Sequence, residues 1–577
     1  MPEPKMHIYM PLQHGEVRML RCRRTFTSTG AVRCSTSISG PGSTRTTIAR
    51  EIGIDRVRLT DSPSFTALSY TWGSPNQDHQ LRLCDNTLLP ITKSLAEALI
   101  HVLDDIEDGF LWIDQICINQ NNNNERNHQV PMMGDIYRRA RRVFVWLGTE
   151  ATGAERIDRI FQDFETATAT LTTDMMLMDA FVLSQEAYLN KQAMISMMKL
   201  PWFERAWVVQ EFVLAQDPIF AHGRFRWHPD TMFLVTCLFR DLGRETFSKF
   251  LRHEISYLRK NHPFQIMQNT KEVHEDFHLL LSRMGSKCKA SEPRDRVYAF
   301  LALNRDPRIN IKAMYDVPVH RVFTEVARTI ITATENLDIL AVAPRQPPSI
   351  SHIPIEFPED YPSWAPNWCC DRLSVPLYSR ASHVPFNACL GLPWIEQNPQ
   401  PDEPNHLILQ GRVIATVYET SPILSGTGSR QRVLRVCISD GSFIPHLSAR
   451  AVARDLEFRQ SIGLSHANLE SLLYVLNSEE QPESYIDEKL LLEEYVLVLQ
   501  NRKLFVTADG RIGLAQSCVR AGDTVIIAHG SATPLVIRTI DERKQAFKLI
   551  GQCYLENAMF GEECDFEKWP MSSFCIT

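Results

Sequence analysis

Strands and helices alternate between residues 65 and 148, and this alternation limits the fold more than any other feature of the sequence. Short runs of aromatic and β-branched residues predict the strands, and apolar residues at helical spacing, such as Leu95, Leu99 and Val102, predict the helices between them. Short links join these elements, which is typical of a parallel α/β sheet. The strands are predicted at 65–73, 111–118 and 143–148, and the helices at 92–109 and 130–142.

Two local features refine the predicted helices. Ser94 and Glu97 have the spacing of a capping box, so they predict the start of the first helix. Pro131 cannot sit in a helix interior, so the second helix either starts there or kinks. The run Asn121 to Asn124 predicts a loop and an N-cap ahead of Glu125.

Composition changes along the chain predict five segments. Residues 22–58 are rich in Ser, Thr, Gly and Arg without a hydrophobic period, which favours a mobile insertion or tail. Proline-rich stretches near 343–366 and 393–404 predict connections. The segments are a variable basic Ser/Thr-rich stretch (1–60), the α/β domain (61–225), a helical annex (226–340), a Pro-rich connection (341–405) and a β-rich α+β domain (406–577).

Charge and cysteine content exclude several classes of protein. The 61 basic and 68 acidic residues leave a net charge of -7, so no basic field favours nucleic acid. No apolar run is long enough to span a membrane, and no signal-peptide pattern opens the sequence. The 14 cysteines include no CxxC pair. Free thiols in a reducing cytoplasm are therefore expected, with no bound metal.

Small or polar residues follow each predicted N-terminal strand. Gly73 comes after Tyr70 and Trp72, Asn119 follows the strand that contains Asp114, and Gly148 ends the third strand. Ligands of parallel sheets bind outside the carboxyl ends of the strands, so these residues are expected to meet. A charge within an apolar strand must be paired or functional. Asp114 is therefore either a site residue or the partner of a loop or an arginine.

Glu211 is the second candidate carboxylate. It lies four residues after Trp207, on one face of a predicted helix and within an apolar run. Burial there would raise the pKa of Glu211 and suit it to acid/base work or to stabilising a developing cation. The alternative is an exposed glutamate paired with Arg205.

His274 and His278 belong to a literal HExxH match, the pattern that binds zinc in metalloproteases. No third-ligand signature follows, with Glu292 only a guess, so a coincidental match on a surface helix is the favoured interpretation. A zinc hydrolase stays open as a third hypothesis.

Several long, Trp-rich motifs resemble those of the fungal heterokaryon-incompatibility (HET) domain family. The resemblance extends over about 60–577, with a longer stretch before the first motif, an Asn run after Gln120 and Pro131 as departures. The motifs are ALSYTWG (67–73), LWIDQICINQ with Glu125 and Arg126 (111–126), MxxIY and VFVWLG (133–148), RAWVVQE (205–211), EPRDRVYAFLAL (292–303), YPSWAPNW (361–368), and the closing LFVTADGRIGL, GDTVIIAHG and LIGQCYLENAMFGE.

This resemblance implies an effector of fungal non-self recognition that triggers programmed cell death. It also implies a fold like that of Toll/interleukin-1 receptor (TIR) domains, which are flavodoxin-like, and several of which cleave NAD with a catalytic glutamate. Carried over by position, Glu211 is the expected catalytic residue. Nucleotide binding is then expected of Tyr70, Trp72, Asp114, Asn119 and Arg205.

The expected ligand is a nucleotide, with NAD as a substrate and no cofactor required. Protein partners or self-association are expected as well. A module that signals through protein partners without catalysis is the alternative function, because the same Trp-rich blocks could build a docking surface.

Overall fold

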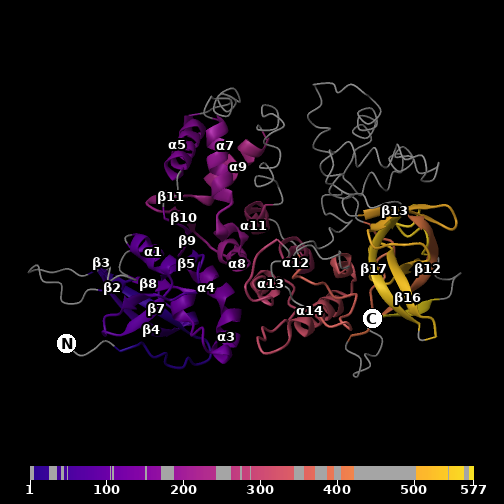
Figure 1. The fold of residues 1–577 in the computed structure, drawn as a ribbon, viewed down its shortest axis with the longest axis horizontal. Helices are drawn as coiled ribbons and strands as arrows, with labels where there is room; N and C mark the ends of the chain where they lie inside the picture. Colours follow the sequence, from indigo (N-terminus) through magenta and orange to yellow (C-terminus); the bar gives the residue numbers. More distant parts are fainter. Residues whose placement is uncertain are drawn as a thin grey trace, which may run out of the picture. The chain divides into compact units, whose positions relative to one another are not determined.

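The computed structural model divides the chain into two compact units (Figure 1). The first comprises 1–276, 287–305 and 312–316, and the second comprises 277–286, 306–311 and 317–577. The structure describes residues 5–24, 36–40, 45–48, 50–103, 105–106, 109–149, 153–170, 187–241, 262–272, 276–285, 287–343, 357–370, 386–395, 405–420, 502–543, 545–564 and 571–577. Within these ranges no helix is long and apolar enough to cross a membrane.

A seven-stranded sheet organises the first unit. Its order is β11-β10-β9-β5-β8-β1-β4. The four strands β10, β9, β5 and β8 are parallel, while the outer strands pair antiparallel. The expected α/β class is therefore confirmed as a mixed sheet with a parallel centre. The strands are β1 (Glu16–Arg24), β4 (Arg50–Arg58), β5 (Phe65–Tyr70), β8 (Gly109–Trp112), β9 (Arg142–Gly148), β10 (Pro218–His222) and β11 (Phe225–Trp227).

The first unit also contains a separate four-stranded sheet and the helices that connect its strands. The sheet consists of β2 (Thr36–Ser39), β3 (Arg45–Ile48), β6 (His79–Arg82) and β7 (Leu88–Ile91). The helices are α1 (Lys93–Val102), α2 (Asp114–Cys117), α3 (Asn123–Gln129), η3 (Val130–Met132), α4 (Met133–Arg139), α5 (Ala154–Thr170), α7 (Ala187–Met198), η4 (Pro201–Glu204), α8 (Trp207–Val213), α9 (Pro229–Asp241), α11 (Pro263–Glu272) and α13 (Asp295–Tyr298), with the short 3-10 turns η2 (Leu59–Asp61) and η7 (Leu301–Leu303).

The ends of these helices test the local sequence signals. Thr92, rather than Ser94, caps α1, because its side chain accepts the backbone N–H of Leu95. Pro131 lies in the 3-10 turn η3 between α3 and α4, which confirms a break in the second predicted helix. Asn122 caps α3 by accepting the N–H of Glu125, as the Asn run predicts.

Residues 111–118 do not form one buried strand. β8 ends at Trp112, and Asp114 begins the one-turn helix α2. The side chain of Asp114 accepts the adjacent backbone N–H of Gln115 at 2.7 Å, a local bond that competes with strand pairing. Ile116 and Cys117 of α2 and Ile118 after it are also buried. The apolar pattern of the sequence therefore continues past the end of the strand.

The N-terminal segment contributes to the central sheet. β1 pairs with β4 along its whole length and with β8 at the sheet interior. The expectation of a mobile insertion or tail at 22–58 is therefore wrong for 22–24, 36–39, 45–48 and 50–58, which form strands, whereas 25–35, 41–44 and 49 lie outside the described residues. Val17, Met19 and Leu20 of β1 are fully buried. A segment of basic composition therefore contains a strand of the hydrophobic core.

Arg18 fixes this strand to the polypeptide that follows α2. Its two guanidinium nitrogens donate to the Glu125 carboxylate at 2.6 and 3.0 Å, and it also bonds Cys117 O at 3.1 Å. The Arg18 and Glu125 side chains are 2% and 10% exposed. This bidentate pair is a strong geometry for a buried ion pair.

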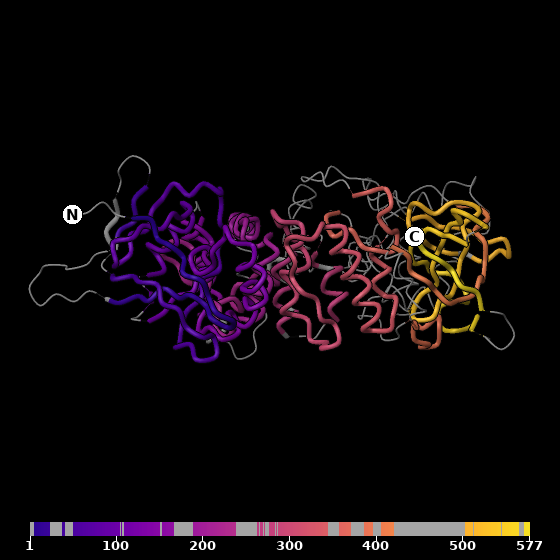
Figure 2. The backbone as a smooth tube through the Cα atoms, turned by 90° about the horizontal axis from the view of Figure 1, so that it is seen from below, coloured from indigo at the N-terminus to yellow at the C-terminus, as the bar shows by residue number. Residues whose placement is uncertain are grey.

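Helices and a closed barrel make up the second unit. Its helices are α12 (Phe277–Met284), α14 (Val319–Thr334) and η8 (Asp338–Val342). Trp364 and Trp368, from the predicted Pro-rich connection, are fully buried. The barrel strands, orange to yellow in Figures 1 and 2, are β12 (Leu407–Thr420), β13 (Arg502–Thr507), β14 (Ile512–Gln516), β15 (Thr524–Ala528), β16 (Leu535–Asp541), β17 (Ala546–Leu555) and β18 (Ser572–Ile576).

The barrel closes because β12 pairs with both β15 and β13. The order β13-β14-β17-β16-β15-β12 returns to β13, and β18 pairs with β12 and β17. The β-rich C-terminal region is thus confirmed, while residues 421–501, where the sequence also predicts a helix near 463–476, lie outside the described residues. Gly513 lies under the Phe505 ring, which leaves no room for a Cβ atom. An aromatic ring over a cross-strand glycine fixes the pairing of β13 with β14.

The Arg18 pair gives a stability prediction. Arg18→Met leaves the Glu125 carboxylate buried without its cation, so we expect the free energy of unfolding to fall by about 3 kcal/mol. Chemical denaturation of the full chain measures this loss. The control Arg224→Met removes an ion pair with Glu155 whose side chains are 66% and 68% exposed, and should cost about 0.5 kcal/mol at most. Equal losses for the two variants would contradict a structural role for Arg18.

Candidate functional site

The carboxyl ends of β5 and β8 bring two predicted site residues together. The strands are parallel neighbours, so Trp72 after β5 and Asp114 after β8 leave the same edge of the sheet. The indole N–H of Trp72 donates to Asp114 Oδ2 at 2.9 Å. Ser94 of α1 bonds Thr71 O at 2.5 Å and so holds the Trp72 segment from the other side. The predicted convergence of Trp72 and Asp114 therefore occurs.

Glu211 reaches the same sheet from helix α8. The hydroxyl of Ser69, on β5, donates to Glu211 Oε2, and the indole N–H of Trp202 donates to the Ser69 oxygen at 2.8 Å. Glu211 is 2% exposed and Ser69 is 1% exposed. The alternative of an exposed helix glutamate is therefore wrong.

Arg205 and Tyr70 lie within electrostatic range of both carboxylates. The Arg205 guanidinium donates to the backbone carbonyl of Tyr70, at the end of β5. Its positive charge acts on both Asp114 and Glu211. The Tyr70 ring is buried with them, and its hydroxyl has no hydrogen-bond partner in the structure. A buried donor without an acceptor is costly and is typical of a place that receives a water or a ligand.

The environment shifts the pKa of both carboxyl groups upward. Burial raises the pKa of Glu211 to about 7; the charge of Arg205 opposes the rise, and that of Asp114 adds to it. Burial also raises the pKa of Asp114, against the opposing effects of Arg205 and the Trp72 hydrogen bond. Glu211 is thus poised to change charge near neutral pH, which suits acid/base work or the stabilisation of a cation.

Asn119 is held within its own loop. Its backbone N–H donates to Glu125 Oε1 at 2.7 Å, and its side-chain oxygen accepts the N–H of Asn121 at 3.2 Å. Its neighbour Gln120 bonds the backbone carbonyl of Asp114 at 2.9 Å. The structure thus connects Gln120 to Asp114, and a binding role for Asn119 stays a prediction.

The sequence does not predict three residues as members of the site: Ser69, which bonds Glu211, Trp202, which bonds Ser69, and Gln115, whose backbone N–H bonds Asp114. Gln115 accepts the backbone N–H of Thr92 at 3.2 Å, while its buried side-chain NH2 group lacks a partner. The argument that singled out Asp114, a polar residue inside an apolar strand, applies equally to Ser69 in FTALSY. Trp202 carries no such signal, because a tryptophan in an apolar run predicts only burial.

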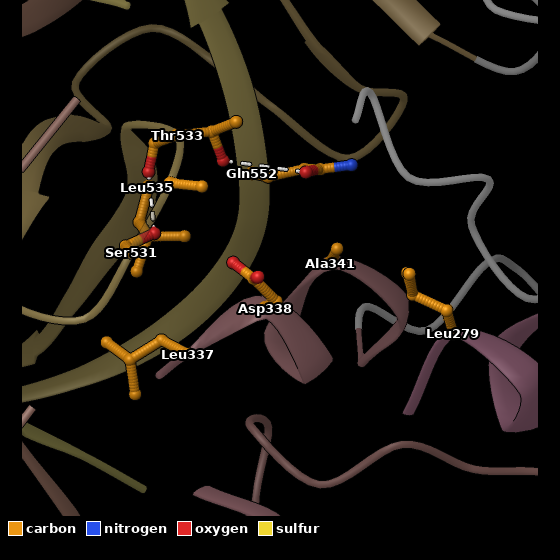
Figure 3. A pocket seen from close by; sticks show the side chains of 9 residues that line it. Leu279, Leu337, Asp338, Ala341, Ser531, Thr533, Leu535 and Gln552 are labelled. Atoms are coloured by element: carbon orange, nitrogen blue, oxygen red, sulfur yellow. Dashed lines mark hydrogen bonds between the residues drawn. The ribbon is translucent and has the colours of Figure 1, made fainter. Parts of the chain in front are cut away.

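A small hollow lies in the other unit, between η8 and the barrel (Figure 3). Asp338, Ser531 and Thr533 line it with Gln552, whose buried side-chain NH2 group has no partner. Thr533 contacts Gln552 Oε1 at 3.5 Å. Its free volume of about 20 Å³ accommodates one water molecule and is far too small for a nucleotide.

The predicted zinc pair cannot be assembled from the described chain, since His274 lies outside it. His278 is buried in α12. Within the described ranges, the structure contains no group of three or more side chains arranged to hold a metal ion. The zinc hypothesis therefore stays untested.

The raised pKa of Glu211 predicts a pH dependence of stability. The folded chain binds a proton that the unfolded chain has released between pH 4.5 and about 7, so the free energy of unfolding should fall as pH rises through this range. The contribution of Glu211 is about 3 kcal/mol. Chemical denaturation at several pH values measures the difference between the wild type and Glu211→Gln, which keeps an acceptor for Ser69 and cannot ionise. A difference that does not change with pH would contradict the raised pKa.

Comparisons with known proteins fit this architecture. The model of the family described as "Heterokaryon incompatibility protein (HET)" matches residues 65–211, from the start of β5 to Glu211, and that of the "Het-6 beta-barrel domain" matches residues 483–569. "Heterokaryon incompatibility protein 6, OR allele" of Neurospora crassa is 24% identical over an alignment that covers 88% of this chain and 91% of the relative. No solved structure matches. The HET match in the first unit and the Het-6 barrel match in the second, together with this relative, support a fungal HET domain protein.

Proposed function

We propose that this chain acts in heterokaryon incompatibility, the process for which its Neurospora crassa relative is named. In this proposal it is an effector that kills incompatible fused cells, and its first unit does so by hydrolysing the nicotinamide–ribose bond of NAD. Glu211 is the catalytic residue. The observation that carries the proposal is the meeting of Glu211 with Asp114, Arg205 and Tyr70 at the carboxyl ends of parallel strands.

The order of the parallel strands supports a TIR-like assignment. Along the sheet the four strands run β8-β5-β9-β10, which is 2-1-3-4 in chain order. That is the order of the corresponding strands in flavodoxin-like folds, whose ligands bind at the carboxyl edge between the strands numbered 1 and 3. Ser69 lies on β5 and pairs with Val145 on β9, so its bond to Glu211 ties the carboxylate to this edge.

The chemistry of the bond suits the charges of the site. Cleavage of a glycosidic bond passes through an oxocarbenium-like transition state, whose positive charge a nearby carboxylate stabilises. Water then bonds to the ribose carbon, and the products are nicotinamide, ADP-ribose and a proton. In the proposal Glu211 is ionised at the ribose, Asp114 and Arg205 set the field around it, and Trp72 and Tyr70 flank the rings. No cofactor is required.

The burial of Glu211 also favours a second candidate function. A carboxyl group that is 2% exposed and bonded to Ser69 is equally suited to hold α8 against β5 in a module that signals through protein partners without catalysis. In that case Glu211→Gln keeps cell killing on overexpression, because the glutamine preserves the contact. Substitutions of exposed charges, by contrast, abolish killing.

Incubation of the purified full chain with NAD tests the catalytic proposal. We expect nicotinamide release by the wild type, including a concentrated or crosslinked form, and at least a hundredfold lower kcat in Glu211→Gln, because the amide cannot stabilise the cation. Release should rise as pH passes through about 7, where Glu211 ionises. Chromatography of the nicotinamide product measures the rate.

The matched control is Glu155→Gln, which changes a glutamate of the same unit that is 68% exposed. Its rate should equal that of the wild type. Absence of nicotinamide release from every wild-type preparation would contradict catalysis and leave the non-catalytic module. Release that persists in Glu211→Gln would instead place the catalytic group elsewhere.

A further inference from the structure

Helix α8, which carries Glu211, is too short to hold its own position. It has seven residues, from Trp207 to Val213, and helices of this length depend on tertiary contacts for their stability. One contact is the bond from Ser69 to Glu211. The other end of the helix is held by polypeptide that follows the matched HET segment.

Asp295 of α13 is the main anchor at that end. Its Oδ2 accepts the indole N–H of Trp207 at 2.8 Å, and its Oδ1 accepts the hydroxyl of Tyr315 at 2.7 Å. Asp295 is 7% exposed, and the Arg126 guanidinium stacks on the Tyr315 ring with its carbon 4.4 Å from the ring centroid. Both oxygens of the buried carboxyl group are thus used for placing aromatic side chains.

The backbone before α8 is fixed by the same downstream polypeptide. The N–H of Ala206 donates to Lys289 O at 2.9 Å, Arg205 forms an isolated bridge with Lys289, and the Lys289 ammonium bonds Glu204 at 2.6 Å. Arg205 is the cation that acts on both site carboxylates. Residues 287–305 of the first unit therefore contact the polypeptide on which Arg205 and Glu211 lie.

The spacing of Trp207 and Glu211 couples the Asp295 contact at one end of α8 to the Ser69 contact at the other. Residues four apart lie one above the other on a helix, so a rotation or shift of α8 at Trp207 also moves Glu211. A displacement of a catalytic group by about 1 Å can lower a rate a hundredfold.

We propose that Asp295 is a positioning residue for Glu211, acting through Trp207, and that residues 287–305 and 312–316 of the first unit complete the site beyond the matched HET segment. This inference rests on the proposed function only in its kinetic part. Its structural part is that the Asp295 contacts hold α8 in place, and this can be measured without any substrate.

Three substitutions test the anchor in the full chain. Tyr315→Phe removes one donor and keeps the ring, Trp207→Phe removes the indole N–H and leaves a smaller aromatic ring, and Asp295→Asn removes the negative charge and one of the two acceptor oxygens. We expect kcat for nicotinamide release to fall about tenfold or more in Trp207→Phe and Asp295→Asn, with KM unchanged because neither residue contacts the substrate. The double variant Trp207→Phe/Asp295→Asn should be no slower than Asp295→Asn alone, since both remove one contact.

The matched control is Asp158→Asn, which disrupts the bond from the Trp227 indole to Asp158 at 2.9 Å in the same unit. Hydrogen exchange provides the second readout: backbone amides of 206–214 should exchange at least tenfold faster in Asp295→Asn and unchanged in Asp158→Asn. Unchanged exchange at α8 in both Asp295→Asn and Trp207→Phe would overturn the inference, as would equal acceleration by Asp158→Asn. If the wild type releases no nicotinamide but exchange responds as expected, the proposed function fails and the anchor stands.

Discussion

The first unit depends on placing a carboxyl group where water cannot solvate it. Glu211 is buried against β5, and an ionised carboxylate in such a position is costly unless hydrogen bonds and an opposite charge compensate. Ser69 supplies the bond, Trp202 orients Ser69, and Arg205 supplies the charge. Ser69 lies on β5, whereas Trp202 and Arg205 both lie in the turn before α8. The sheet edge, the turn before α8 and the downstream polypeptide must therefore all be in place for this one group.

Local signals in the sequence predict most of the parallel core and part of the site. Glu211 and Asp114 stand out because each is a charge within an apolar run, and the structure places both in one electrostatic neighbourhood. The strand predicted over 111–118 is too long. The apolar pattern indicates which residues are buried, and it does not distinguish the buried strand β8 from the buried helical turn α2. Arg18 and Glu125, or β12 and β13, meet only through long-range pairing, which no local pattern encodes.

Segments of the two units alternate along the chain between residues 277 and 316. Residues 277–286 belong to the second unit, 287–305 return to the first, and 306–311 belong to the second again before 312–316 return. The predicted helical annex at 226–340 is therefore divided between two hydrophobic cores. A C-terminal truncation between 277 and 294 removes residues from both, including Asp295, which accepts the indole N–H of Trp207, and Tyr315, which donates to Asp295.

The closed barrel has a consequence for association between chains. Each strand of the circuit from β13 through β14, β17, β16 and β15 to β12 pairs with a neighbour on both sides. An edge strand offers unpaired N–H and C=O groups to which a strand of another chain can bind, and closure removes such edges. The described strands of this circuit therefore offer no free edge for intermolecular strand pairing.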